Sequence, residues 1–159
     1  MVVSRFFAFP NPVDEHAART VAALVAGTAV VAIVTQAWWL TVPLAVGFLL
    51  RVATGPRVSP FALVATKVVA PRFARPKHVP GPPKRFAQGI GAVVTGAGAI
   101  AALVGANEVA AVALGVIVVA ATLEAALGFC LGCWMFARGI DLGLVPESVC
   151  ERCAVSYDG

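Results

Sequence analysis

Charged residues are scarce in this sequence. They make up 13% of its 159 residues, and apolar residues make up 60%, whereas soluble domains carry about 25% charged residues. A soluble fold of this length cannot bury so much apolar side chain, so the surplus must face lipid. The low charge therefore excludes an ordinary soluble domain and predicts an integral membrane protein.

Several familiar motifs are also missing. The first twenty residues lack the basic start, short apolar core and small-residue cleavage site of a secretory signal, so we expect no cleavable signal peptide. The sequence has no haem-ligand pair, phosphate-binding loop, nucleophile triad or nucleic-acid module, and His16 and His78 are isolated. No nucleic-acid partner is therefore predicted, despite the net charge of +4.

The sequence does contain long apolar runs. Since about 20 apolar residues cross hydrocarbon roughly 30 Å thick, we predict four membrane spans, over about residues 14–35, 38–52, 89–106 and 109–136. Asn11 as N-cap and Pro12 at the first helical position are predicted to start the first span. The second span is short and contains Pro43, so we expect it to be tilted, kinked or only partly lipid-exposed. Small residues recur on one face of the third, which predicts a central place in the bundle.

The loop between the second and third predicted spans, residues 53–88, is rich in proline and basic residues. Ser59 to Val69 predicts a short interfacial helix, with Ser59 as N-cap and Pro60 in the first turn. Pro71 to Pro83 is too rich in proline for a helix and should be extended. We therefore expect one transmembrane domain over residues 1–138 and a cytoplasmic tail over residues 139–159.

The basic residues predict the orientation. All twelve Lys and Arg lie in the N-terminal arm, the central loop or the C-terminal end, and neither short turn between spans contains one. With four spans these three segments share one side, which the positive-inside rule makes the cytosol. The predicted fold is an all-α, four-span helical bundle in the cell membrane with both termini cytoplasmic. The basic loop is expected to contact lipid, and docking of an acidic partner is left open.

The four cysteines form two Cys-x-x-Cys pairs, with none left over. Cys130 and Cys133 are predicted to share one face of the fourth helix, where they can form a disulfide or hold a soft metal. Counting about 20 residues along that span puts its inner end near Phe129, so this pair should lie at or just beyond the interface. Sixteen residues separate Cys133 from Cys150, which with Cys153 fits the C-x2-C-x15–20-C-x2-C zinc pattern.

Three uses of these thiols are open. Cys130 and Cys133 can be small packing residues, with Gly128 and Gly132 on a close-contact GxxxG face. The four thiolates can instead hold one zinc or iron ion, although the first pair follows a membrane helix rather than a knuckle turn. A redox or sulfur-handling dithiol is favoured, because cysteine is scarce and its reactivity usually decides its use. A permanent structural disulfide is disfavoured in the cytosol. The cofactor is left open between zinc and none.

Glu124 is the only acid expected inside hydrocarbon. Insertion scales put a charged residue there at about +2.5 to +3.5 kcal/mol, so Glu124 should face the bundle interior, protonated or paired. It can serve as a proton acceptor or ligand near the thiols, or simply as a partner in an interhelical hydrogen bond. On an unbroken helix the six residues to Cys130 amount to roughly 240°, so the two side chains are not expected to share a face.

Four motifs occur in order along the chain: NPVDE at residues 11–15, PGPPKRFAQGIG at 80–91, LEAALGFCLGCW at 123–134 and VPESVCERC at 145–153. Together they resemble the bacterial family known as domain of unknown function 4395. The resemblance implies a four-span membrane protein without an established activity. It also implies, through genes that neighbour members of this family, an association with thioredoxin-like and rhodanese-type sulfurtransferase proteins. Both cysteine pairs match the family pattern.

The leading hypothesis is a membrane thiol relay or sulfur-handling protein. In it Cys150 and Cys153 exchange with a soluble thioredoxin-like or sulfurtransferase partner and with Cys130 and Cys133, beside Glu124. The alternatives are a structural metal site made by the same four cysteines and a non-catalytic subunit of a larger membrane complex or homo-oligomer. Whether the protein is an enzyme, and whether it transports a small sulfur species, are both left open.

Overall fold

The computed structural model describes residues 13–55, 58–72 and 77–146. Its α-helices are α2 (Glu15–Thr35), α3 (Thr41–Thr54), α4 (Pro60–Val64), α5 (Gly81–Leu103), α6 (Asn107–Leu127) and α7 (Leu131–Asp141). Short helical turns are η1 (Trp38–Leu40), η3 (Ala65–Val69) and η4 (Ala70–Arg72), and the two-residue strands β1 (Val13–Asp14) and β2 (His78–Val79) pair antiparallel. The predicted all-α class is confirmed.

Three of these helices, α2, α5 and α6, are long and apolar enough to cross a membrane. The second predicted span is different: η1 and α3 together form a shorter apolar helix over Trp38–Thr54. Pro43 lies in the first turn of α3, where backbone N–H groups have no intrahelical acceptor. The missing N–H of Pro43 therefore does not interrupt the helix. The structure thus contains three helices of spanning length and a fourth, shorter apolar helix.

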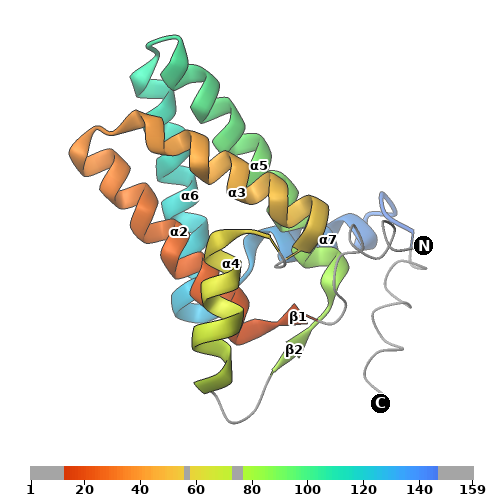
Figure 1. The fold of residues 1–159 in the computed structure, drawn as a ribbon. Coiled ribbons are helices and arrows are strands. Elements are labelled where there is room, and N and C mark those ends of the chain that lie inside the picture. Colours follow the sequence, from red (N-terminus) through yellow and green to blue (C-terminus); the bar gives the residue numbers. More distant parts are fainter. Residues whose placement is uncertain (1–12, 56–57, 73–76, 147–159) are drawn as a thin grey trace, which may run out of the picture.

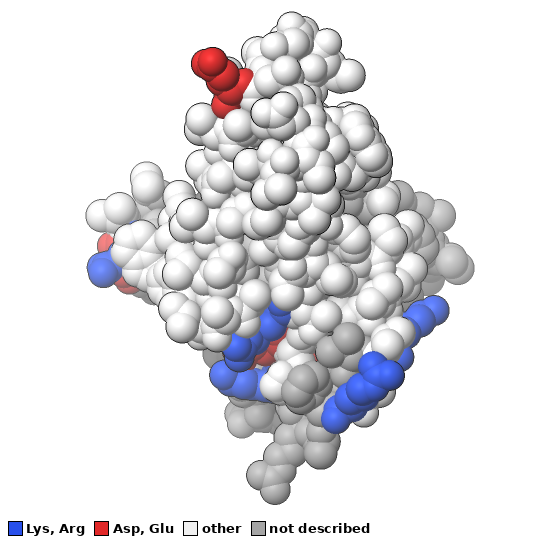
Figure 2. Space-filling view, turned by 90° about the vertical axis from the view of Figure 1, so that its left-hand side faces the viewer, with Lys and Arg blue, Asp and Glu red and all other residues white. Residues whose placement is uncertain are grey.

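The outer surface of the long helices is apolar. Valine and isoleucine side chains project outward from each of them, including Val34 (76% exposed), Val93 (72%) and Val112 (68%). Figure 2 shows an uncharged band on the face in view, with Lys and Arg gathered at the lower end. Such a surface would be unfavourable in water and suits lipid, which supports a membrane protein.

The first helix starts later than predicted. Asp14 is the N-cap of α2, and its carboxylate accepts a hydrogen bond of 2.8 Å from the His16 N–H. The residue before it, Val13, is extended because it pairs with Val79 of β2, so the helix cannot begin at Pro12. Asn11 and Pro12 lie outside the described residues.

The third long helix starts earlier than predicted. α5 begins at Gly81 and contains Pro82 and Pro83 in its first turn, where a proline displaces no intrahelical hydrogen bond. The extended segment expected over Pro71 to Pro83 is therefore wrong at both ends, because Pro71 lies in the helical turn η4 and Pro83 in α5. The central loop is also shorter than residues 53–88. This correction transfers Lys84 and Gln88 from a surface loop to a helix of the bundle.

The short helix in the central loop is present. Ser59 is the N-cap of α4 and Pro60 is its first residue, as predicted, and η3 continues it as a π-helical turn. Ala62 and Ala65 are buried in the core. The Ser59 hydroxyl does not cap this helix. It accepts a hydrogen bond from Arg51 of α3 instead.

Helix α5 packs on α3, α6 and α7, whereas α2 packs on α6 at the other side of the bundle (Figure 1), so the expected central place of α5 is not found. Its small residues explain the close contacts. A Cβ added at Gly91 would lie 2.3 Å from the Phe48 ring of α3, and one added at Gly98 would lie 3.0 Å from Ala113 of α6. Glycine on this face lets the helix backbones approach.

Candidate functional site

The fourth apolar run is not one helix. We predicted a continuous span over residues 109–136, but α6 ends at Leu127 and α7 starts at Leu131. Gly128 stands between them with φ +67°, a left-handed conformation that glycine adopts without strain. Hydropathy alone does not reveal such a break, because every residue around it is apolar. Gly128 is therefore a helix terminator and not part of a GxxxG packing face.

Arg19 of α2 fixes this break. Its guanidinium donates hydrogen bonds to the carbonyl of Ala125, at 2.9 and 3.0 Å, and to that of Ala126, at 2.8 Å. The last carbonyls of a helix lack intrahelical partners and carry partial negative charge. A cation there supplies the missing hydrogen bonds and interacts favourably with the helix dipole. The first long helix thus secures the end of the last one.

Cys130 is the N-cap of α7. Its sulfur accepts a hydrogen bond of 3.3 Å from the backbone N–H of Cys133, in the first turn of the helix. An N-cap group faces the positive end of the helix dipole, which favours an anion. The prediction that the two cysteines share one face of a continuous helix is therefore wrong. Cys130 precedes α7, and Cys133 lies in its first turn.

The two thiols have opposite acidities. The hydrogen bond from the Cys133 thiol, together with nearby Lys84 and the Cys133 N–H, lowers the pKa of Cys130 below its ordinary value of 9.0. The same thiol–thiol hydrogen bond, with burial, raises the pKa of Cys133. Both cysteines are free thiols in this structure. Cys130 is thus the thiol that ionises first, and the Cys133 proton is retained to stabilise it.

Glu124 faces the bundle interior and forms an ion pair with Lys84 of α5. The side chains are 15% and 8% exposed, so the pair is largely desolvated. Because the helix breaks at Gly128, the angular argument that separated Glu124 from Cys130 does not apply, and both line one cavity. Glu124 therefore does lie near the thiols, together with a cation.

Arg51 of α3 is a second buried cation, only 4% exposed. Its guanidinium donates to Gln88 Oε1 at 2.8 Å and to the Ser59 hydroxyl at 3.1 Å, and it lies 4.4 Å from the centre of the Phe48 ring. These partners are neutral, and no carboxylate of the described residues forms an ion pair with Arg51. Arg51 therefore places a positive charge at the cavity wall without a directly paired carboxylate among the described residues.

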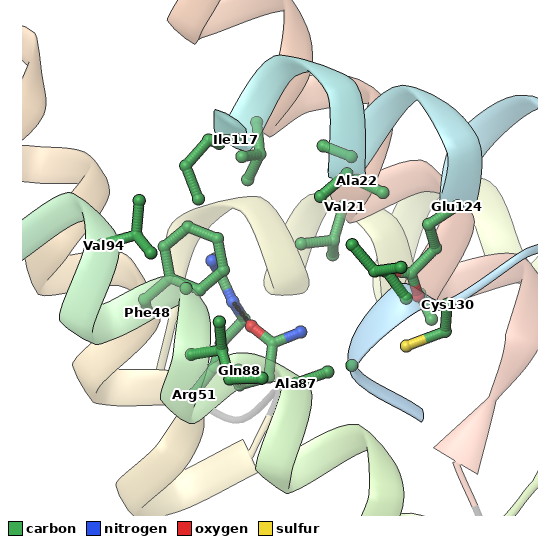
Figure 3. A pocket seen from close by; sticks show the side chains of 18 of the residues that line it. Val21, Ala22, Phe48, Arg51, Ala87, Gln88, Val94, Ile117, Glu124 and Cys130 are labelled. Atoms are coloured by element: carbon green, nitrogen blue, oxygen red, sulfur yellow. Dashed lines mark hydrogen bonds between the residues drawn. The ribbon is translucent and has the colours of Figure 1, made fainter. Parts of the chain in front are cut away.

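The cavity has a volume of about 110 Å³ and lies between α2, α3, α5 and α6, with the start of α7 at one end. Most of its wall is aliphatic or aromatic. Its polar lining residues are Arg51, Gln88, Glu124 and Cys130. Figure 3 shows the Cys130 sulfur and the Gln88 amide directed into the same open space. A nucleophilic thiol therefore opens on an apolar chamber inside the bundle.

Comparison with known families gives one result. The profile of the family described as Domain of unknown function (DUF4395) matches residues 13–140. The chain belongs to this family. No curated protein and no solved structure matched. The DUF4395 match includes Cys130 and Cys133 but ends before Cys150 and Cys153. The family match therefore does not test the resemblance of the tail pair.

The predicted metal site of this DUF4395 protein needs four cysteines, and two of them are not described. Cys150 and Cys153 lie beyond residue 146, outside the described residues. Within the described ranges no three His, Cys, Asp or Glu side chains come together as metal ligands. The four-cysteine zinc or iron site stays a prediction.

Sequence analysis missed the cations and the amide of this site. A predicted loop over residues 53–88 includes Lys84 and Gln88 and begins beside Arg51, because basic residues usually mark the membrane surface. A signal was available: Pro82 and Pro83 after Gly81 suit a helix start, and extending the helix back to them puts Lys84, Gln88 and Gly91 on one face. The pairing of Lys84 with Glu124, 40 residues apart, required the structure.

Proposed function

We propose that Cys130 and Cys133 of this DUF4395 protein exchange disulfides with a thioredoxin-like protein, with Cys130 as the attacking thiolate. One observation carries this proposal: Cys130 is the N-cap of α7 and accepts a hydrogen bond from the Cys133 N–H. A helix N-terminus and a Cys-x-x-Cys spacing both favour the thiolate, which is the reactive form. The lowered pKa of Cys130 supports the same assignment.

The exchange proceeds in two balanced steps. The Cys130 thiolate attacks one sulfur of the partner disulfide, so a mixed disulfide forms and the partner's other sulfur leaves as a thiolate that takes up a proton. Cys133 then loses its proton and attacks the Cys130 sulfur, which releases the partner as a dithiol. Both steps are reversible, so electrons can pass in either direction. The tail pair, Cys150 and Cys153, is proposed as a second dithiol that exchanges both with the partner and with Cys130 and Cys133.

We further propose that η1 and α3 cross the membrane with α2, α5 and α6, which makes four spans. The basic segments then lie on the cytosolic side, and Cys130 meets partners from the cytosol. The second span is short, but it packs on α5 and turns Val42, Val46 and Leu49 outward, as a lipid-facing helix would.

The test is to trap the mixed disulfide. The Cys133→Ser variant should stay covalently joined to a thioredoxin-like partner through Cys130, because the resolving thiol is gone, and a reductant should release it. Cys130→Ser/Cys133→Ser should trap nothing at this site. In a chain that also carries Cys150→Ser and Cys153→Ser, a Cys133→Ser variant that traps no partner, or traps no more than Cys130→Ser, would contradict the proposal.

A further inference from the structure

In the reverse direction of the proposed exchange, the Cys130–Cys133 disulfide oxidises a partner dithiol and becomes a dithiol, which must be reoxidised before the next cycle. Each cycle in this direction leaves two electrons on Cys130 and Cys133, and a bundle in lipid can pass them to an acceptor dissolved in the membrane. The cavity behind Cys130 has two features that such an acceptor needs: apolar walls and a polar donor.

The donor is the amide of Gln88. Its Oε1 is held by Arg51, which can only donate hydrogen bonds, so the amide orientation is fixed and its NH2 group remains to donate. Figure 3 shows this amide on the cavity wall, facing the space that Cys130 also faces. A ligand placed between them needs an acceptor oxygen on one side and an electrophilic centre for the thiolate on the other.

The cavity can take up part of a ring. Its volume of about 110 Å³ is smaller than the roughly 150 Å³ engineered cavity that takes up benzene, but it is partly open, so a ring can extend beyond it. Val116 of α6 lines the cavity and is also 51% exposed, so the cavity lies directly behind the apolar outer surface of the bundle. An isoprenoid or alkyl chain attached to the ring has a short distance to cross to reach lipid.

We propose that this cavity binds the ring of a lipid-soluble quinone, with one carbonyl oxygen on the Gln88 amide, and that the quinone oxidises Cys130 and Cys133. This rests on the proposed thiol exchange and names its electron acceptor. The two thiols lose two electrons and two protons and gain one S–S bond, and the two quinone oxygens gain those electrons and protons as a hydroquinone. Arg51, behind Gln88, stabilises the negative charge that develops on the quinone oxygen.

A small sulfur anion is less suited to this chamber. Burying an anion among aliphatic side chains is costly unless several donors surround it. The cavity offers one amide, because the Arg51 guanidinium is engaged by Gln88, Ser59 and the Phe48 ring. A neutral quinone avoids this cost until it accepts electrons.

The experiment uses the full chain with Cys150→Ser and Cys153→Ser, reduced and kept anaerobic in detergent. The probe is a benzoquinone whose ring is fully substituted and carries a decyl chain, so that a thiol cannot add to the ring. We expect one hydroquinone, read from its absorbance, for each two thiols lost. Gln88→Glu should slow this reaction about tenfold, because a carboxylate keeps the acceptor for Arg51 but repels the quinone oxygen.

Controls separate this inference from the thiol-exchange proposal. Ala22→Leu should fill part of the cavity and slow quinone reduction, whereas Val30→Phe, on the exposed side of α2, should not. Exchange of the thiols with a small soluble disulfide should be the same in the Ala22→Leu variant, which adds no charge, as in the parent. In Gln88→Glu the new carboxylate also opposes the Cys130 thiolate, so its rate with quinone should fall by a larger factor than its rate with the disulfide.

If the thiols are lost with the small disulfide but not with the quinone, the quinone site is overturned and thiol exchange stands. The same conclusion follows if the thiols react with thiosulfate and not with the quinone. Thiols that react with neither oxidant would overturn both proposals.

Discussion

Beside the hydrogen bond from Cys133, two charged side chains act on the Cys130 thiol in opposite directions. Lys84 lowers the pKa of Cys130 and Glu124 raises it, and these two side chains form a largely buried ion pair with each other. Charges interact strongly where water is excluded. Residues far apart in the sequence thus act on the acidity of one cysteine, while Cys133, three residues along, keeps its proton.

Replacing Lys84 by Met should raise the pKa of Cys130, because the ammonium stabilises the thiolate. Less thiolate is then present at neutral pH, so alkylation of Cys130 should slow several-fold and its pH profile should move to higher pH. Glu124→Gln should move the profile to lower pH, since the carboxylate opposes the thiolate. Iodoacetamide rates measured against pH, with the label located by mass spectrometry, would show both shifts.

The control for these variants is Lys77→Met, which removes a side chain that is 70% exposed and paired with Glu15. It should leave the Cys130 profile in place. Lys84→Met/Glu124→Leu tests stability separately: breaking a buried pair costs about 3–5 kcal/mol, and removing both partners avoids most of that loss. If the pH profile of Cys130 alkylation moves in the same direction in Lys84→Met and in Glu124→Gln, the charge argument is contradicted.

At the scale of elements, the break between α6 and α7 determines where the thiols lie. Gly128→Ala should cost about 1–2 kcal/mol in unfolding free energy, because alanine is disfavoured at φ +67°. An added Cβ would also lie 3.0 Å from a Glu15 carboxylate oxygen. The variant should therefore displace Cys130 and slow its alkylation.

Gly105→Ala is the matched control for Gly128→Ala. Gly105 also has a positive φ, +80°, but no atom lies within 4 Å of an added Cβ, and it stands in the turn before α6. We expect a similar loss of stability in detergent unfolding and unchanged Cys130 alkylation. If the two variants alter alkylation equally, the break is not what positions the thiol.

Helix α7 is held against α5 at Gly132. A Cβ there would lie 2.5 Å from the Cβ and 2.6 Å from the Cα of Ala87, so Gly132→Ala must push the backbones apart. Overpacking of this kind costs about 1–3 kcal/mol. Gly139→Ala, in the same helix, places its Cβ at 3.4 Å from Val145 and should be tolerated. Thermal unfolding of the two variants would give the comparison, and equal melting temperatures would argue against close packing here.

The elements show what the sequence can and cannot reveal. Hydropathy located α2 and the body of α6, because lipid exposure selects apolar residues over a whole helix. It misplaced the start of α5, since prolines were taken as helix breakers although the first turn accepts them. It also missed the break at Gly128, which depends on one backbone angle. The cysteines and Glu124 were found by their rarity, and Lys84, Gln88 and Arg51 were not, since their partners lie far away in sequence.

At the scale of the whole molecule, charge is segregated along the bundle. The exposed Lys and Arg in view gather near one end, below an apolar band (Figure 2). The turn that joins α5 to α6 carries Glu108, in the first turn of α6, and no basic residue. This asymmetry underlies the proposal that the basic end faces the cytosol.

Labelling of intact cells tests that orientation. With all four native cysteines changed to Ser, a cysteine introduced by Asn107→Cys should react with a membrane-impermeant maleimide. One introduced by Lys77→Cys, in the basic segment before α5, should react only after the cells are opened. Reaction of both in intact cells would contradict the four-span arrangement, because an odd number of crossings between them is required.

The clamp of Arg19 on the last carbonyls of α6 joins positions 106 and 107 residues apart. A ribosome makes Arg19 long before it makes Ala125, so α2 is synthesised with a cation that has no partner until nearly the whole chain has emerged. The site at Cys130 can mature only after that point. Thiol acidity is therefore a late event in biogenesis, and a nascent chain halted before Ala125 has no means of arranging it.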